Sequence, residues 1–511
     1  MDTDVVVIGA GPTGLMLAAW LAELEIDAVI VDGKAEPTRE SRAIGLQARS
    51  IEIYDQLGVV ERVMQEARVA PAARPGYGHQ MFNAVEFDAL GEGQTPYPQL
   101  YILEQSRNER ILVDALRSRG RDVRWGQKLV GLVETADREG VTVAVADGDG
   151  AEQTITARYV VGADGASSLV RELRGIAFEG TTNAETFCVI DANGVTGLDE
   201  DAINIRPFET DLLLTFPMEG EGHARIITVV PEAEHHDGDG ADALENAVRE
   251  RVRTSFGVTW QSHTWFATYR VHHRVAERFR DGVVFLAGDA AHVHSPVGAQ
   301  GMNTGLQDAH NLAFAFADVL KRGAPDSILD RYEAERMPVA RHLIATTDSL
   351  FSFVTSPETV PRLVRRIAPR LLGPIITRLL PRTWIGDRGF GYLGQLRVRY
   401  HVPGSEHADG TRDDVVGRRL PWAGDNVDAL RSHEWQVHEY GSADPADTAR
   451  LERALGCEVH VFSAAPDTPL IPGEFYLVRP DGYVVARARP SEAAETFAGV
   501  LPGRRTLEGQ E

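Results

Sequence analysis

The chain has 511 residues, of which 43% are hydrophobic, and its formal net charge is -23. A chain of this size can bury a large core and divide into two or three domains. Because so acidic a surface repels phosphate backbones and anionic lipid headgroups, the charge argues against nucleic-acid and membrane-surface binding. Two cysteines, Cys188 and Cys457, form no CxxC motif, and no His/Cys cluster has metal-ligand spacing. We therefore predict a cytoplasmic protein without a disulfide framework, a metal site, a signal peptide or a membrane span.

The first residues predict a β-α-β unit. An apolar strand at 5–8 leads through Gly9-Ala10-Gly11-Pro12-Thr13-Gly14 into a helix from about 15 to 24, and a second strand at 28–31 ends at Asp32. Gly9 permits the tight turn, Gly11 lets the backbone approach a pyrophosphate, and Gly14 lets the helix pack closely on the strand. The helix N-terminus attracts phosphate, and the Asp32 carboxylate accepts hydrogen bonds from ribose hydroxyls. This arrangement predicts a dinucleotide site.

Two further glycine-containing turns also follow apolar strands. Asp164-Gly165 and Gly288-Asp289 are, taken singly, equally compatible with ordinary β-turns. The second is more informative, because a polar loop with Pro296 and Gly298 follows it and leads to an amphipathic helix at 303–320. That helix N-terminus would stabilise negative charge on a flat ligand such as a flavin. Asp289 would accept a hydrogen bond from the ribityl chain.

The rest of the chain divides by pattern. Further helices are expected at 48–57 and from Gln105 onward, and the pattern stays helical from 332 to about 382. Between 178 and 267, strands at 203–205, 212–216 and 225–230 and an acidic loop at 232–242 predict an inserted antiparallel sheet. A polar linker is expected at 401–416. The tail contains strands at 458–462 and 474–478 and a turn at 480–482.

These motifs together resemble the group A flavoprotein monooxygenases, FAD-dependent hydroxylases of phenols and aromatic polyketides. The resemblance is dense from residue 1 to about 345. It includes Ser41-Arg42-Ala43, Gly301-Met302-Asn303-Thr304-Gly305, Gln307-Asp308-Ala309 and Tyr332-Glu333-Ala334-Glu335-Arg336. The tail resembles the thioredoxin-like C-terminal domain of such hydroxylases through Arg479-Pro480-Asp481-Gly482-Tyr483, and departs from it at Ala486-Arg487. Without a CxxC motif we expect no redox activity there.

The resemblance implies an α/β fold with three domains. A discontinuous Rossmann-like FAD-binding domain covers 1–177 and 268–345, and the substrate-binding antiparallel sheet covers 178–267. A helical segment at 346–400 and the linker at 401–416 precede a thioredoxin-like domain at 417–511.

The resemblance also implies roles for single residues. Arg42 lies near the FAD diphosphate and the incoming nicotinamide, Gln105 touches the FAD, and Pro296 and Gly298 belong to the catalytic loop that faces the flavin ring. The full expected set of cofactor-binding residues is Gly9, Gly11, Pro12, Thr13, Gly14, Asp32, Arg42, Gln105, Asp164, Gly288, Asp289, Pro296, Gly301, Met302 and Asn303.

The family's reaction cycle follows from the same resemblance. NADPH or NADH reduces FAD, dioxygen adds at the flavin C4a atom, and the resulting hydroperoxide transfers one oxygen to an electron-rich ring. A general base would help to ionise a phenol, and the candidates are Tyr101, Tyr269, His292 and His294, none of which we assign. His292 is expected to have a structural role. The inserted sheet forms one wall of the substrate pocket, so Phe208, Leu214, Phe216 and Arg225 are candidate substrate contacts, although the strand register is open.

The leading hypothesis is therefore an FAD-dependent, NAD(P)H-consuming monooxygenase that hydroxylates a phenolic or polycyclic aromatic substrate. The alternatives are a Baeyer–Villiger or epoxidising enzyme on the same fold, or a non-catalytic flavoprotein that binds an aromatic ligand. A flavin halogenase is disfavoured, because Trp260 and Trp265 do not have the spacing of its Trp-x-Trp motif. Substrate identity and the choice between NADH and NADPH are left open, and the protein is expected to be a monomer or a homodimer.

Overall fold

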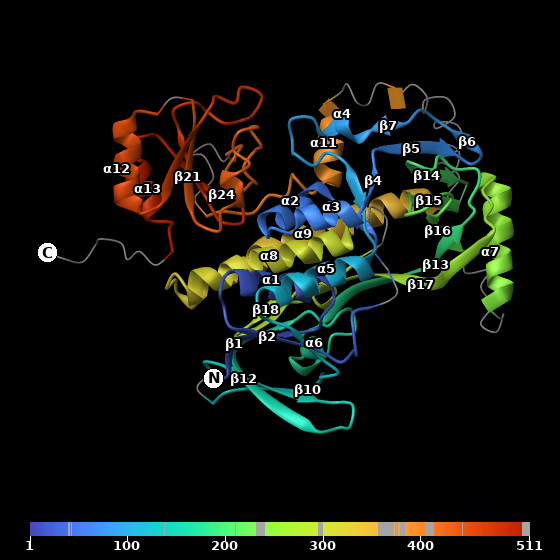
Figure 1. The fold of residues 1–511 in the computed structure, drawn as a ribbon, viewed down its shortest axis with the longest axis horizontal. Helices are drawn as coiled ribbons and strands as arrows, with labels where there is room; N and C mark the ends of the chain where they lie inside the picture. The colour runs from blue at the N-terminus through green and yellow to red at the C-terminus, as the bar shows by residue number, and fades with distance from the viewer. Residues whose placement is uncertain are drawn as a thin grey trace.

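We describe the protein from a computed structural model (Figure 1). The described residues are 1–38, 41, 43–136, 138–209, 211–230, 241–294, 300–355, 373, 377–378, 384–403, 413–441 and 443–502. Three predicted site residues, Arg42, Pro296 and Gly298, lie outside these ranges, as does most of the acidic segment 232–242.

The N-terminal sheet brings the three motif-bearing strands side by side. β1 (Thr3–Ile8) pairs in parallel with β12 (Glu152–Gly162), which in turn pairs in parallel with β19 (Val284–Leu286). Because parallel strands end at the same edge of a sheet, the turns after β1, β12 and β19 meet there. The other strands of this sheet are β2 (Ala28–Asp32), β9 (Val123–Trp125), β10 (Lys128–Glu134), β11 (Val141–Ala146) and β18 (Arg280–Asp281).

Long helices cover the N-terminal sheet. α1 (Pro12–Glu23) packs against α5 (Gln105–Ser118) and α8 (Gly301–Leu320), with the Trp20 and Phe314 rings 5.1 Å apart. The expected amphipathic helix is confirmed as α8, but its polar side is buried as well, from Asn303 to Asp318. The reason is that α9 (Asp330–Thr355) and α2 (Ala48–Gln56) also pack on it. The remaining helices of this half are α3 (Val60–Glu66), α4 (Phe87–Gly91) and α6 (Leu169–Leu173).

The inserted sheet is larger than the sequence suggested. Long strands β13 (Phe178–Asn193) and β17 (Ser262–Ala276) pair antiparallel with each other, and β14 (Ile203–Phe208), β15 (Asp211–Pro217) and β16 (Ala224–Val230) extend the sheet. It also takes in β5 (Ala72–Tyr77), β6 (Gln80–Met81), β7 (Val85–Glu86) and β20 (His292–Val293), which lie outside 178–267. Pairing of β5 with β14 joins strands more than a hundred residues apart, so local pattern does not reveal it.

One face of the inserted sheet is covered by a helix that the sequence analysis missed. α7 (Ala241–Phe256) lies along this face, at the right of Figure 1. Its Val248, Val252 and Phe256 pack on Cys188 and Ile226 of the sheet. The acidic residues just before α7 hid its apolar spacing.

The C-terminal region has its own core. β21 (Gln436–Tyr440) lies between parallel β22 (Glu458–Phe462) and antiparallel β23 (Phe475–Val478), followed by β24 (Val484–Ala488); α12 (Pro445–Leu455) and α13 (Ala493–Ala498) complete it. This β-α-β-β-β-α order agrees with the thioredoxin-like prediction, which stays a proposal. Val415 and Val416 are buried in the same core, so the packed unit begins before residue 417.

Two smaller features complete the fold. A short sheet of β3 (Gly45–Leu46), β8 (Leu100–Ile102) and β4 (Arg68–Ala70) stands beside α2, and α11 (Trp384–Leu393) contacts α4. Within the described ranges, no helix is long and apolar enough to cross a membrane.

Candidate functional site

The glycine turn after β1 has the geometry expected for a pyrophosphate cradle. Gly9 has φ = +104°, and a Cβ on it would collide with the backbone of Ala163. A Cβ on Gly14 would overlap the carbonyl oxygen of Gly9, so α1 packs directly on the turn. Around Gly11, by contrast, no atom of the described structure lies within 4 Å of the position of a Cβ. The turn is therefore tightly packed at two of its glycines and open at the third, where a ligand would approach.

Asp32, at the end of β2, is held rigidly beside this turn. Its Oδ2 accepts the Ala10 N–H at 2.6 Å, and its Oδ1 accepts the Lys34 N–H at 2.7 Å. The Lys34 ammonium stands 3.8 Å from Asp32 and 3.8 Å from Glu109. Because each carboxylate oxygen can accept more than one hydrogen bond, Asp32 can still receive ribose hydroxyls.

Gln105 opens α5, as expected, and its side chain contacts the backbone of Ala43. Its Oε1 accepts the Ala43 N–H at 3.4 Å, while its Nε2 donates to Glu109 Oε1 at 3.0 Å. The other oxygen of Glu109 accepts the Thr38 N–H at 2.8 Å. Sequence reasoning missed Glu109, although its i+4 spacing from Gln105 places the two on one helix face.

Asp164 follows β12 and carries a buried acceptor. Its Oδ2 accepts the Val170 N–H at 3.1 Å, whereas its Oδ1 is buried without a hydrogen-bond partner among the described residues. Burial raises the pKa of this carboxyl. A buried oxygen without a donor is satisfied when a ligand hydroxyl or N–H reaches it.

The turn after β19 is packed against α1. Gly288 has φ = +60°, and a Cβ there would overlap Thr13 Oγ1. The same hydroxyl occupies the space beside Gly305 of α8. Thr13, predicted to bind cofactor, therefore uses its side chain to pack α1 on this turn. Asp289 is exposed between the buried residues Gly288 and Ala290.

The side chains of Met302 and Asn303 contact neighbouring elements of the scaffold. Asn303 Oδ1 accepts the Gln47 N–H at 2.9 Å and the Ser50 hydroxyl at 2.7 Å, and its Nδ2 donates to Gly45 O at 2.8 Å. Met302 Sδ lies 3.6 Å from Asn108 Nδ2. Asn303 thus links the start of α8 to β3 and α2, and Met302 contacts α5. A role of these two residues in cofactor binding stays a prediction.

Asp308 is a buried anchor to which the sequence analysis assigned no role. Its Oδ2 accepts the Gly288 N–H at 3.2 Å and lies 2.7 Å from His292 Nε2, and its Oδ1 accepts Arg336 Nε at 2.7 Å. Burial raises the pKa of Asp308, but Arg336 and His292 offset this effect and lower it to about 2. The contact with Asp308 gives His292 a place in the scaffold.

The four candidate substrate residues do not share one face of the inserted sheet. Leu214 and Phe216 belong to the core that contains Phe187, opposite α7, and the strand register places Arg225 on the same face. Phe208 lies on the α7 face, where its ring packs 5.5 Å from Tyr77 and 6.4 Å from Phe256. Phe208 is therefore removed from the proposed substrate set.

Arg225 is fully buried on the sheet face opposite α7. It forms a bidentate pair with Asp191, at 2.6 and 2.7 Å, and its guanidinium carbon lies 5.2 Å from the centre of the Trp265 ring. Its Nη1 has no hydrogen-bond partner among the described residues. This face thus combines aromatic side chains with one buried donor.

The tyrosine candidates for a general base are protonated at neutral pH. Burial raises the pKa of Tyr269, an effect that nearby Arg225 only partly opposes. Burial and Asp88 raise the pKa of Tyr101 to about 12, and its hydroxyl donates to Gln99 at 2.9 Å. His294 stands over Gly301, at the start of α8.

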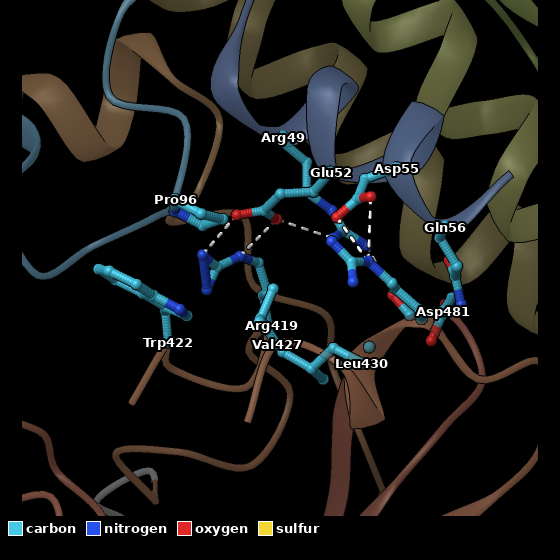
Figure 2. A pocket seen from close by; sticks show the side chains of 12 residues that line it. Arg49, Glu52, Asp55, Gln56, Pro96, Arg419, Trp422, Val427, Leu430 and Asp481 are labelled. Atoms are coloured by element: carbon cyan, nitrogen blue, oxygen red, sulfur yellow. Dashed lines mark hydrogen bonds and ion pairs between the residues drawn. The ribbon is translucent and has the colours of Figure 1, made fainter. Parts of the chain in front are cut away.

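Two cavities flank α2. A small cavity at its N-terminus is lined by Gln47, Ala48, Phe87, Gln99, Leu100, Phe390, Leu393 and Gly394. A second cavity lies between α2 and the C-terminal region (Figure 2). Its charged lining is internally paired, since Glu52 binds Arg49 and Arg419, and Asp55 binds Arg431. The first cavity adjoins the core that contains Phe187 and Phe216, because Ala48, Leu100 and Phe390 line the cavity and belong to that core.

Comparison with known proteins agrees with this geometry. Residues 2–347 match the FAD binding domain family. The chain belongs to this family. It is 33% identical over 495 residues to a rifampicin monooxygenase of Streptomyces venezuelae, covering 94% of this chain and 95% of the relative. It is 32% identical over 491 residues to a flavin-dependent monooxygenase of Mycobacteroides abscessus, covering 94% and 96%. The OxyS anhydrotetracycline hydroxylase of Streptomyces rimosus superposes with a TM-score of 0.76 at 28% identity, covering 99% of each chain.

This FAD-dependent monooxygenase has residues that fit the cofactor. The open space at Gly11, the fixed carboxylate of Asp32 and the buried Asp164 oxygen lie at one edge of the N-terminal sheet. Bound FAD supplies hydride acceptance and oxygen activation, which no side chain of the protein provides.

Proposed function

We propose that this monooxygenase consumes NAD(P)H and dioxygen and hydroxylates a phenolic or polycyclic aromatic substrate. The observation that carries the proposal is the aromatic face of the inserted sheet. Phe187, Phe216, Trp265 and Tyr269 form or adjoin one core with Ala48, Leu100 and Ile102, residues from the elements beside the flavin site. An aromatic substrate packs well on such a surface, because offset and edge-to-face ring contacts are favourable.

The relatives support a ring-containing substrate. Their names specify rifampicin and anhydrotetracycline, and another relative, 30% identical over 522 residues, is a 12-dehydrotetracycline 5-monooxygenase/anhydrotetracycline 6-monooxygenase. The buried Arg225 Nη1 adds a requirement for a polar group on the substrate. A buried donor without an acceptor lowers the stability of the folded protein, and a bound acceptor removes this cost. We therefore expect the substrate to carry a phenol, phenolate or carbonyl oxygen that accepts this hydrogen bond.

The side chains of the chain act by positioning and by excluding water. Asp32 and the α1 N-terminus would hold the ribose and pyrophosphate, and Asp164 and Asp289 would bind hydroxyl groups of FAD. Leu214 and Phe216 would shield the substrate from solvent, which would limit side reactions with water at the site. Tyr101 and Tyr269 are protonated at neutral pH and therefore do not act as general bases. We expect a substrate whose own phenol pKa is low, because it ionises without such a base.

The test is substrate-dependent NAD(P)H oxidation and oxygen uptake by FAD-loaded protein, using a panel of phenols and polycyclic quinones with ¹⁸O₂. The proposal expects one compound to accelerate oxidation and to acquire a single labelled oxygen as a hydroxyl group. Label in a lactone, ester or epoxide would favour the Baeyer–Villiger or epoxidising alternative. Ligand binding without faster oxidation would favour a non-catalytic flavoprotein.

Several sequence predictions stay predictions. They are the roles of Arg42, Pro296 and Gly298, the choice of NADPH or NADH, a cytoplasmic location, and a monomeric or homodimeric state.

A further inference from the structure

We propose that Arg336 is a positioning residue for the flavin site and that the C-terminal region sets its orientation through Tyr400. The parts positioned are the two flavin-loop anchors, defined as residues 288–292 and 300–304. The inference rests on FAD binding by this family, and it does not depend on the proposed substrate.

Arg336 reaches both anchors with one guanidinium group. It lies on α9, is fully buried, and donates from Nε to Asp308 Oδ1 at 2.7 Å. Asp308 in turn binds the Gly288 N–H and His292 of the first anchor. Arg336 Nη2 donates to the Thr304 carbonyl oxygen of the second anchor at 3.2 Å. Arg336 is therefore connected directly to the second anchor and, through Asp308, to the first.

The third nitrogen of Arg336 turns toward the C-terminal region. Nη1 donates to the Tyr400 hydroxyl at 3.0 Å, and the Tyr400 ring stacks on Tyr483 with centroids 4.1 Å apart and an angle of 20°. The Tyr400 N–H also donates to Gly417 O at 2.7 Å. The position of Tyr400 is thus set by contacts with the C-terminal region as well as by its hydrogen bond with Arg336.

A second contact also joins α9 to the C-terminal region. Glu335, adjacent to Arg336 on α9, binds Arg479 Nη1 at 2.6 Å and Nη2 at 2.9 Å. Arg479 also binds Asp481 on its own turn, at 2.6 and 2.9 Å. The C-terminal region therefore contacts α9 at two consecutive residues, Glu335 and Arg336. Of these, Arg336 also connects to the two anchors.

Only an arginine satisfies this arrangement. Its planar group carries donors in three directions, toward Asp308, Thr304 and Tyr400, whereas lysine has a compact ammonium on a flexible stem. A lysine at 336 keeps the charge opposite Asp308 but cannot hold all three acceptors. The resulting change should appear in the flavin environment.

The experiment compares Arg336→Lys and Tyr400→Phe with wild type. The readouts are the FAD dissociation constant, the visible circular dichroism of bound FAD and the flavin reduction potential. Loss of one buried hydrogen bond predicts about threefold to tenfold weaker FAD binding for Tyr400→Phe, and a larger loss for Arg336→Lys. Both variants should change the visible dichroism and the potential, which a general loss of stability would not alter in the protein that remains folded.

Arg331→Lys is the matched control. Arg331 lies on the same helix and pairs with buried Asp318 of α8 at 2.8 Å, but no described contact links Asp318 to the anchors. FAD affinity and dichroism should stay unchanged in this variant. The proposal is overturned if Tyr400→Phe folds with unchanged FAD affinity, dichroism and potential, or if Arg331→Lys has the same effects. If Arg336→Lys does not fold, Tyr400→Phe decides the question alone.

Discussion

Gly11 and Gly14 stand three residues apart in one turn, but their surroundings differ. A Cβ on Gly14 has no room, because the carbonyl oxygen of Gly9 occupies its position. A Cβ on Gly11 meets no described atom within 4 Å. Gly14 is therefore required by the fold, whereas Gly11 is required only when a ligand approaches.

The two positions therefore give opposite predictions. Gly14→Ala should destabilise the protein by about 1–3 kcal/mol through overpacking, with loss of FAD binding as a consequence. Gly11→Ala should leave the stability of FAD-free protein within about 0.5 kcal/mol but weaken FAD binding at least about tenfold, equivalent to about 1.4 kcal/mol. Chemical unfolding of apoprotein and FAD titration measure the two effects. Equal FAD affinity in Gly11→Ala and wild type would remove Gly11 from the cradle.

At the scale of elements, side chains of the inserted sheet alternate between two faces. One face packs on α7, and we propose that the other contacts the substrate. Phe208 and Phe216 both come from neighbouring strands, but they point to opposite faces. The face with Phe208 is closed by α7, whereas the face with Phe216 turns toward the elements beside the flavin site. We therefore expect substrate contact on the second face.

Alanine substitutions separate the two faces. Phe216→Ala should raise the KM for the substrate by about fivefold, because one aromatic contact is worth on the order of 1 kcal/mol. Phe208→Ala should lower the free energy of unfolding and leave the KM unchanged, since its ring packs on α7 and Tyr77. Steady-state kinetics with the identified substrate, together with thermal melting, distinguish these outcomes. A raised KM in Phe208→Ala alone would reverse our assignment of the faces.

At the scale of the whole molecule, buried ion pairs join the C-terminal region to the FAD-binding part. Arg419 binds Glu52 of α2, as Figure 2 shows, and Arg479 binds Glu335 of α9. Arg49 Nη2 donates to the Asp481 carbonyl oxygen at 2.6 Å. Because such contacts require both partners to be in place, we expect the two parts to unfold together.

Removing one charge from this junction should be costly. Arg479→Met leaves Glu335 and Asp481 buried without their shared cation, which predicts a loss of about 3–5 kcal/mol. Arg450→Met in α12 is the control, because Arg450 is half exposed and its pair with Asp447 should contribute less than about 1 kcal/mol. Guanidinium unfolding at pH 7 measures both. Equal losses in the two variants would argue against the ion-pair junction.

The same junction should depend on pH. Burial raises the pKa of Asp481, but Arg479 offsets this effect and lowers it to about 2. A carboxyl with a lowered pKa in the folded protein stabilises it above the unfolded value of about 4 and loses this contribution as the pH falls toward 2. The stability advantage of wild type over Arg479→Met should therefore be constant from pH 7 to about 5 and decline below pH 4.

Several parts of the site were predictable from local pattern. The β1–α1 turn, Asp32 at the end of β2 and Gln105 at the start of α5 lie where strand endings and helix starts placed them. Helix α7 was missed because acidic residues precede it, and β5 escaped notice because its partner β14 is distant in sequence. Asp308 and Arg336 were visible as residues, but their pairing depends on how α8 and α9 pack.

The sequence by itself determined the dinucleotide cradle and the family of the protein, because glycine spacing and strand endings are local properties of the backbone. Only the tertiary structure decided which of the motif side chains pack against neighbouring elements. Asn303 and Thr13 carry the motif, yet their side chains hold neighbouring elements, while Phe208 turns to the wrong face. These outcomes depend on strand register and helix packing, which arise from contacts between residues far apart in the chain.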